Sequence, residues 1–330
     1  MHKITWLPGD GIGPEVTGST IKVINATGVK IDWERVEIGE KVLAESGKPL
    51  TDDVFDIVKK NKIAIKGPTT TPIVSGHSSA NVALRKGLNL YACVRPIKSI
   101  SGIRSLYKDL DIVVIRENTE GLYTDKEQEI VPGVVECLKI VTEQASRRIA
   151  RFTFEYAKKE GRKKVTAVHK ANIMKMTDGL FLSCVREISK DYPKIQYEEG
   201  IVDSTCMQLV TNPYQYDVLV MGNLYGDIIS DLCAGLIGGL GVAPGANFGD
   251  GCAIFESVHG SAPDIAGKNI ANPIASILSG ALMLRYIGED SAAKRIEDSV
   301  RKVVKQGMLT KDLGGSATTD GLTSAIEKEL

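Results

Sequence analysis

The amino-acid sequence predicts an α/β protein, because segments typical of strands alternate with segments typical of helices along the chain. Several strand-like segments run into polar or glycine-rich stretches, which is where α/β sheets bind ligands. The 330 residues are 43% hydrophobic and 25% charged. This globular composition suffices for one large core or for two domains.

The alternation starts near the first residue and continues into the second half of the chain. Short apolar runs that are rich in β-branched residues and bounded by turn residues predict strands. The expected strands cover residues 4–7, 30–37, 63–66, 112–116, 165–169 and 218–221, and helices are expected from about Glu15, from about Asp52, from Asp227 and over residues 273–283.

Two stretches differ from this alternation. Residues 120–136 are polar with short β-like pieces, which indicates an arm rather than a part of the core. Residues 235–251 contain seven glycines and one proline, which is typical of a hinge or a crossover between domains. The sequence shows no internal repeat.

A glycine-rich loop, PGDGIGPE at residues 8–15, follows the first expected strand and opens a helix. Its glycines are spaced G-x-G-x-G, whereas the pyrophosphate turn of a Rossmann fold needs G-x-G-x-x-G. Asp32 stands about where a ribose-binding acid would be, but a lone aspartate is weak support. Pro14 suits the first turn of a helix. The loop therefore predicts a tight strand-to-helix turn that can still border a cofactor.

Two aspartates, Asp227 and Asp231, follow the expected strand over residues 218–221. Side chains four positions apart share one face of a helix, so both carboxylates point the same way. Paired carboxylates at the carboxyl end of a strand suit a hard divalent cation such as Mg²⁺ or Mn²⁺. An N-cap aspartate followed by a solvated one is the alternative interpretation of this segment.

Arginines, a tyrosine and a lysine lie at or near the ends of other apolar segments. Arg85, Arg95 and Arg116 are candidates for binding carboxylates, since guanidinium groups bind carboxylates in a bidentate manner. Ordinary surface salt bridges are the alternative for each arginine. Tyr123 and Lys170 are candidate acid/base groups, although a lysine at a strand end is usually only solvated.

The segment HGSAPDIAG at residues 259–267 is a polar loop before the expected helix over residues 273–283. It can hold an adenosine, with Asp264 accepting hydrogen bonds from ribose hydroxyls. The alternative is an ordinary loop with an aspartate near a helix start.

Charge and composition exclude several classes of protein. Lys plus Arg and Asp plus Glu both number 41, so nothing in the net charge favours nucleic acid or anionic lipid. The six cysteines form no Cys-x-x-Cys pair, which indicates buried free thiols rather than disulfides or zinc. No apolar run is long enough for a membrane span, and a strand is expected almost at the first residue. These observations predict a cytoplasmic location without membrane or nucleic-acid partners.

Taken together, these segments resemble the β-decarboxylating dehydrogenases, the isocitrate/isopropylmalate dehydrogenase family, in order and over essentially the whole chain. The resemblance implies two α/β domains in an isopropylmalate-dehydrogenase-like fold rather than a Rossmann fold, with the active-site cleft between the domains. Residues 1–98 and 239–330 would form the large, cofactor-binding domain, and residues 99–238 the small domain with the dimer contacts, the arm and the metal site. The matching segments are residues 9–15, 116–123, 169–172, 223–227 with Asp231, and 259–264.

The resemblance also implies a role for each matching residue. Lys170 and Asp203 would enter the active site of a partner subunit, so that a homodimer or a larger homo-oligomer is expected. The implied catalytic residues are Tyr123 and Lys170, and the implied metal ligands are Asp203, Asp227 and Asp231. The implied substrate-binding residues are Thr71, Ser79, Asn81, Arg85, Arg95 and Arg116, and the implied cofactor-binding residues are Thr70, His259, Gly260, Ala262, Asp264, Ile265 and Asn272.

The implied activity is the NAD-dependent oxidative decarboxylation of isocitrate to 2-oxoglutarate and CO₂ with Mg²⁺ or Mn²⁺, a reaction of the tricarboxylic acid cycle. Asp264-Ile265 resembles the pattern of NAD enzymes, and Ser79 with Asn81 resembles the isocitrate branch. Homoisocitrate and 3-isopropylmalate remain alternative substrates. Some relatives are regulatory subunits without turnover, but the implied catalytic residues are all present here, which favours an active enzyme. A non-enzymatic nucleotide-binding module would explain Asp264 but not the aspartate pair.

Overall fold

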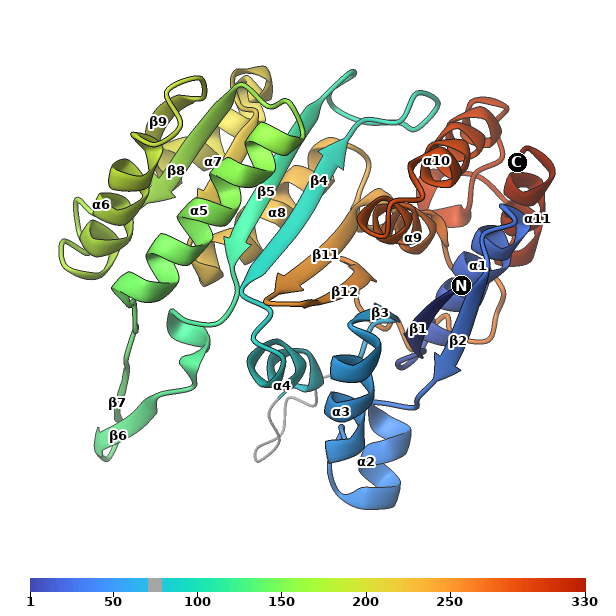
Figure 1. Cartoon of the computed structure of the whole chain (residues 1–330), viewed down its shortest axis with the longest axis horizontal. Helices are drawn as coiled ribbons and strands as arrows, with labels where there is room; N and C mark the ends of the chain where they lie inside the picture. Colours follow the sequence, from blue (N-terminus) through green and yellow to red (C-terminus); the bar gives the residue numbers. More distant parts are fainter. Residues whose placement is uncertain (71–78) are drawn as a thin grey trace. The chain divides into compact units, whose positions relative to one another are not determined.

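The computed structural model describes residues 1–70 and 79–330, and these divide into two compact units. The first unit contains residues 1–88, 98–109 and 234–330, so it is built from both ends of the chain. The second unit contains residues 89–97 and 110–233. Figure 1 shows the elements of each unit with the labels used below.

The first unit has five strands in the order β2-β1-β3-β12-β11. β1 pairs in parallel with β2 and β3, β12 pairs in parallel with β3, and β11 is antiparallel to β12. Helices α1, α9, α10 and α11 pack together although α1 comes from the start of the chain (Figure 1). The strands are β1 His2–Leu7, β2 Ile31–Arg35, β3 Ile63–Lys66, β11 Pro244–Gly249 and β12 Cys252–Ser257, and the helices are α1 Gly13–Ala26, α2 Glu40–Ser46, α3 Asp52–Asn61, α4 Ala80–Gly87, α9 Ile274–Tyr286, α10 Asp290–Lys305 and α11 Thr319–Lys328.

The second unit has five strands in the order β4-β5-β10-β8-β9. The pairs β10–β5, β10–β8 and β8–β9 are parallel, as strand–helix alternation predicts. A separate antiparallel hairpin, β6–β7, extends away from these strands (Figure 1). The elements are β4 Ala92–Lys98, β5 Asp111–Glu117, β6 Glu127–Val131, β7 Val134–Cys137, α5 Glu143–Lys159, β8 Lys164–His169, α6 Thr177–Ser189, β9 Gln196–Ile201, α7 Val202–Thr211, β10 Val218–Met221 and α8 Asn223–Leu236, with short 3₁₀ turns at η1 Leu122–Thr124 and η2 Pro213–Gln215. Two further 3₁₀ turns, η3 Leu240–Val242 and η4 Lys311–Leu313, belong to the first unit.

The apolar runs that predicted strands lie in the core. All four residues of β10 are buried, and so are residues 112–115 of β5. Continuous burial on both faces explains why these strands read as unbroken apolar runs rather than as an alternating pattern. Helix α10 instead buries one stripe, because Ala293, Ile296, Val300 and Val303 recur at helical spacing.

Among the segments singled out in the sequence, two differ in the structure from their interpretation and a third agrees with it. Helix α8 begins at Asn223, four positions before the expected start at Asp227. The glycine-rich stretch over residues 235–251 is not only a connection, since it contains strand β11. The stretch over residues 120–136 does form an exposed arm, with Ile130 and Val135 56% and 67% exposed on the β6–β7 hairpin.

The bounds of the two units also differ from those of the expected domains, which were residues 1–98 with 239–330 and residues 99–238. Residues 98–109 belong to the first unit, because Gly102 lies against the backbone of Val304 and Lys305. Residues 89–97 belong to the second unit, where the Tyr91 carbonyl accepts a hydrogen bond from the Asn118 amide at 2.9 Å. The roles expected for the two domains remain predictions.

Within the described residues, no helix is long and apolar enough to cross a membrane. All six cysteines are free, and four of them (Cys93, Cys184, Cys233 and Cys252) are buried. This agrees with the prediction of free thiols rather than disulfides.

Candidate functional site

Asp227 and Asp231 lie on helix α8, which follows the buried strand β10 after Gly222. Because the helix begins at Asn223, Asp227 is in its second turn, and the N-cap alternative is wrong. The side chains of Asp227 and Asp231 are 40% and 54% exposed. Burial raises the pKa of the Asp231 carboxyl, and the charge of Asp227 raises it further against the opposing effect of Arg95. The two carboxylates therefore repel each other at an accessible position.

Two of the three candidate arginines meet these carboxylates. The guanidinium of Arg116 donates to Asn223 Oδ1 through Nε at 2.9 Å and through Nη2 at 2.6 Å, and through Nη1 to Asp227. Arg95 donates through Nη1 to Asp231 at 3.2 Å and to Ser230. Arg116 is 1% exposed and Arg95 is 7% exposed. These two arginines are therefore not surface salt bridges, since guanidinium groups are rarely buried without a specific partner.

Tyr123 joins the same group of side chains. It lies in η1, and its hydroxyl donates to Asp227 Oδ2 at 2.5 Å. The Arg116 guanidinium carbon lies 5.1 Å from the centre of its ring. Burial and the neighbouring Asp227 carboxylate raise the pKa of Tyr123, so its hydroxyl stays protonated at neutral pH.

Lys170 and Asp203 form a separate pair within the second unit. Lys170 follows strand β8, and its ammonium donates to the Asp203 carboxylate on α7. This hydrogen bond is the largest cause of the lowered pKa of Asp203. Among the described residues of the single chain, no three His, Cys, Asp or Glu side chains are grouped as a metal site. The chain thus does not bring Asp203 together with Asp227 and Asp231, and its supply by a partner subunit stays a prediction.

Arg85 lies in the first unit, at the end of helix α4. Its Nη2 is 3.5 Å from Glu256 Oε1, and Glu256 also accepts from Lys66 Nζ at 2.6 Å and from Asn247 Nδ2 at 2.7 Å. Burial opposes ionisation of Glu256, but Lys66 and Arg85 outweigh it and lower the pKa to about 2. An ionised carboxylate therefore lies next to the Arg85 guanidinium.

The other predicted substrate residues lie at the start of α4, as far as the structure describes them. Ser79 is the N-cap residue of this helix, and Asn81 Oδ1 accepts a hydrogen bond from Thr69 Oγ1 at 3.1 Å. Thr71 lies outside the described residues.

Several predicted cofactor residues of the first unit line a pocket of about 470 Å³, a size suited to a nucleoside. His259, Ile265 and Asn272 contribute to its wall. Asp264 is exposed in the same loop, Gly260 is exposed beside His259, and Ala262 has a positive φ of 39°. Such a backbone conformation is rare for a residue with a side chain and is found at ligand sites.

The glycine loop forms the predicted tight turn between β1 and α1, and it borders this pocket through Ile12. A Cβ atom on Gly11 would lie 2.0 Å from the carbonyl oxygen of Ser261, so only glycine permits this approach. Ser261 in turn contacts Thr70, with 2.9 Å between their hydroxyl oxygens. The glycines therefore serve the close packing of three loops.

The sequence interpretation missed four charged residues of these sites. Lys311 and Asp312 line the pocket, and Asp312 accepts a hydrogen bond from Asn272 Nδ2 at 3.0 Å. Neither lies in a motif. Lys66 and Glu256 are single charges in apolar strands, and this placement was the only signal that could have revealed them.

Relatives of this chain include proteins that act on different substrates. It is 54% identical over 324 residues to a mitochondrial isocitrate dehydrogenase [NAD] catalytic subunit 5 of Arabidopsis thaliana. The aligned region covers 98% of this chain and 87% of the relative. It is 53% identical over 310 residues to a chloroplastic 3-isopropylmalate dehydrogenase of Solanum tuberosum, and this aligned region covers 94% of this chain and 87% of the relative.

The relatives contradict the predicted cytoplasmic location. Besides the Arabidopsis protein, relatives from Drosophila melanogaster and Dictyostelium discoideum, 52% and 50% identical, are named as mitochondrial isocitrate dehydrogenase subunits. The prediction relied on a strand near the first residue, and where a given sequence begins carries no information on the compartment.

A solved structure agrees with the fold over its full length. An isocitrate dehydrogenase from Methylococcus capsulatus has 50% sequence identity and a TM-score of 0.97, with 100% of this chain and 99% of that chain covered. The family model described as isocitrate/isopropylmalate dehydrogenase matches residues 3–329. The convergence of Asp227, Asp231, Arg95, Arg116 and Tyr123 and these matches lead to one conclusion: the chain belongs to the isocitrate/isopropylmalate dehydrogenase family.

Proposed function

We propose that this protein catalyses the NAD-dependent oxidative decarboxylation of isocitrate to 2-oxoglutarate and CO₂. The observation that carries the proposal is the convergence of two buried arginines and a protonated tyrosine on a carboxylate of helix α8. This arrangement offers groups for binding a substrate carboxylate and for donating a proton. The NAD-dependent isocitrate dehydrogenases among the relatives support the same reaction.

The residues on α8 fit a hard divalent cation. Asp227 and Asp231 are one turn apart, partly exposed and mutually repulsive, and a cation between them would relieve that repulsion. We assign these two carboxylates as ligands, together with Asp203 of the partner subunit. Mg²⁺ or Mn²⁺ held there would lower the pKa of the substrate hydroxyl and stabilise negative charge on oxygen.

The guanidinium groups of Arg85, Arg95 and Arg116 would bind the carboxylates of isocitrate. In the structure Arg95 and Arg116 donate to Asp231 and Asp227, so both guanidinium groups are already held next to the aspartates that would bind the cation. Arg85 is held from behind by Glu256. Charged partners that are fixed before binding need less ordering when the substrate arrives.

Two residues would move the protons. The neutral amine of Lys170, supplied by the partner subunit, would accept the proton of the substrate hydroxyl, and NAD bound in its pocket would take the hydride from the same carbon. The resulting ketone would let the neighbouring carboxylate leave as CO₂. Tyr123 then donates its proton to the carbon that lost CO₂, and its raised pKa keeps that proton available.

We assign cofactor binding to the first unit, at the pocket lined by His259, Ile265 and Asn272. Asp264 would accept hydrogen bonds from both ribose hydroxyls and would repel a 2′-phosphate. The NAD preference of this proposal rests on that residue.

The assembly is the second part of the proposal. Relatives are named catalytic, alpha and regulatory subunits, which points to assemblies of unlike subunits rather than a plain homodimer. This chain retains Tyr123, Lys170 and the three aspartates, so we infer that it is a catalytic subunit. Active sites shared across subunits would make a separated monomer inactive.

Homoisocitrate and 3-isopropylmalate are the alternative substrates. The second is supported by the plant 3-isopropylmalate dehydrogenase among the relatives. The test is kcat/KM for isocitrate, homoisocitrate, 3-isopropylmalate, D-malate and tartrate, each with NAD and NADP, at saturating Mg²⁺. Isocitrate with NAD should give the highest value. A higher kcat/KM for homoisocitrate or 3-isopropylmalate would overturn the assignment of isocitrate as the substrate. Absence of turnover with every pair would favour a regulatory subunit.

A further inference from the structure

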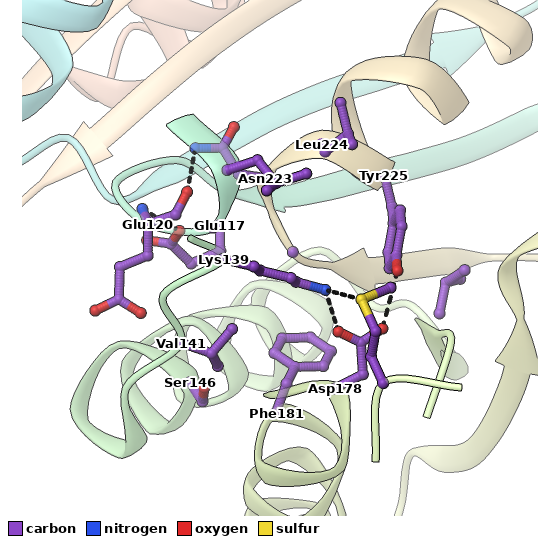
Figure 2. A pocket seen from close by; sticks show the side chains of 15 residues that line it. Glu117, Glu120, Lys139, Val141, Ser146, Asp178, Phe181, Asn223, Leu224 and Tyr225 are labelled. Atoms are coloured by element: carbon purple, nitrogen blue, oxygen red, sulfur yellow. Dashed lines mark hydrogen bonds and ion pairs between the residues drawn. The ribbon is translucent and has the colours of Figure 1, made fainter. Parts of the chain in front are cut away.

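The second unit contains an apolar pocket with a charged cluster at its wall (Figure 2). Leu122, Val141 and Phe181 contribute apolar side chains to it. Lys139, Asp178 and Tyr225 point toward one another inside this lining (Figure 2). None of these three residues belongs to the groups assigned above to substrate, metal or cofactor.

Asp178 is the centre of this cluster. Its side chain is 5% exposed in the first turn of α6. Oδ2 accepts from the backbone amide of Lys170 at 2.7 Å and from the Tyr225 hydroxyl at 3.1 Å, and Oδ1 accepts from Lys139 Nζ. Three donors, one of them charged, therefore hold a buried carboxylate in one orientation.

The two other members are also fixed. Lys139 Nζ lies 4.8 Å from the centre of the Tyr225 ring, a cation–π distance. The Tyr225 hydroxyl donates to Asp178 Oδ2 at 3.1 Å, and the Lys139 ammonium donates to Oδ1 of the same carboxylate. The Lys139–Asp178–Tyr225 cluster is therefore a clamp in which each side chain contacts the other two.

The clamp contacts two segments that carry residues of the proposed site. Lys170 lies between β8 and α6, where its carbonyl accepts from the amides of Ile173 and Met174. Tyr225 lies on α8, two positions before Asp227. Helix α8 has further anchors on its other face, since Arg116 donates to Asn223 and Asp227. The amide of Lys170 has the shorter bond to Asp178, at 2.7 Å.

We propose that Asp178 is a positioning residue for Lys170, which it holds by accepting the Lys170 backbone amide within the Lys139–Asp178–Tyr225 cluster. This inference rests on the proposed function, in which Lys170 is the proton acceptor in the partner's active site. Asp178 would then act on the catalytic centre of the neighbouring subunit rather than on that of its own chain. A displacement of a catalytic group by about 1 Å can lower turnover about 100-fold.

The test compares two double variants that differ only at position 178, where the acceptor for the Lys170 amide and the Tyr225 hydroxyl is kept or removed. Both carry Lys139→Met, which avoids an unpaired buried ammonium. Lys139→Met/Asp178→Asn retains an acceptor oxygen, whereas Lys139→Met/Asp178→Leu removes it at similar volume. We expect kcat of the Leu variant to be about 10- to 100-fold below that of the Asn variant, with KM for isocitrate within about threefold. Equal kcat values in folded assemblies would overturn the proposal.

A complementation experiment separates positioning of Lys170 from a general loss of structure. Protomers with Lys139→Met/Asp178→Leu are co-expressed with Tyr123→Phe protomers under two affinity tags, and doubly tagged assemblies are purified. One of the two hybrid sites then combines an intact Tyr123 with an intact Lys170, so about half of the wild-type kcat per assembly should return. If Asp178 instead acted on its own chain through Tyr225 and α8, neither hybrid site would be intact.

The control mixture is Lys170→Met with Tyr123→Phe. Recovery in the control without recovery in the Asp178 mixture overturns the inference. No recovery in either mixture refutes the shared active site of the proposed function, and the comparison of the two double variants then decides for Asp178 alone. If the Leu variant does not assemble, Lys139→Met/Asp178→Ala takes its place with the same expectations.

Discussion

Replacing Glu256 with glutamine should remove about 3 kcal/mol of unfolding free energy at pH 7. Strands β3 and β12 place Lys66 directly opposite Glu256, and the Lys66 ammonium is 2% exposed. The pKa of Glu256 is lowered from 4.5 to about 2 by Lys66 and Arg85 against the effect of burial. Each pKa unit equals about 1.4 kcal/mol, so the charged carboxylate contributes roughly 3 kcal/mol.

The sign of the pH dependence follows from the lowered pKa. Because the carboxyl is ionised in the folded protein at pH values where the unfolded chain binds a proton, its contribution is complete above about pH 4.5. It is lost progressively as the pH falls towards about 2. The difference in stability between the wild type and Glu256→Gln should therefore be constant from pH 7 to about pH 5 and should narrow below that.

Urea unfolding at equal protein concentration measures this difference, since subunit association also contributes to stability. Lys66→Met/Glu256→Gln is the matched variant and should be more stable than Glu256→Gln, because it leaves no buried ammonium facing a neutral partner. A loss below about 1 kcal/mol, or a difference that does not narrow in acid, would refute the account of this buried pair.

The remaining predictions concern ligands. Asp231→Asn should weaken activation by Mg²⁺ at least about tenfold while the melting temperature changes little, since this carboxylate is 54% exposed; unchanged metal titration would count against the α8 site. kcat/KM should be higher with NAD than with NADP, and Asp264→Asn should reduce this preference about tenfold through loss of repulsion; a wild-type preference for NADP would contradict it. Ser79→Ala or Asn81→Leu should raise KM for isocitrate about tenfold and leave KM for D-malate, which lacks one carboxylate, nearly unchanged.

The part of the site that the sequence could predict is the part that lies close to strand ends. Arg116 lies near the end of β5, whereas Tyr123 follows β5 and the aspartates of α8 follow β10. The register of these parallel strands brings them to the same edge. The existence of β5 and β10 was equally predictable, because both are continuous apolar runs, whereas β4, β9, β11 and β12 were not among the expected strands.

The start of α8 could not be predicted because tertiary contacts decide it. The residues from Gly222 to Gly226 include poor helix formers, which made a helix before Asp227 an unlikely interpretation. Asn223 is held in place from both sides, since its Oδ1 accepts from Arg116 and its Nδ2 donates to the Glu120 carbonyl at 3.0 Å. These contacts compensate for the low helix propensity of the segment.

The buried charge pairs could not be predicted from the sequence for a different reason. Lys66 and Glu256 are 190 positions apart, and Lys139 and Asp178 are 39 positions apart. A single sequence shows each as a lone charge, and only the pairing of strands or the packing of α6 gives it a partner. One residue of each pair contacts a residue of the proposed site: Glu256 contacts Arg85, and Asp178 accepts from the Lys170 amide. These supporting residues were therefore predictable only once the fold was known.

The arrangement of charges would let the proposed site take both a cation and a polyanion. Arg95 and Arg116 are paired with Asp231 and Asp227, so the cluster holds its opposite charges in contact before any ligand enters. A cation bound by the two aspartates would release both guanidinium groups for the substrate, and a substrate carboxylate would release both aspartates for the cation. Neither exchange is favourable alone, because each leaves one half of the cluster without counter-charge. The two ligands should therefore favour each other's binding, which couples the presence of the metal to recognition of the acid.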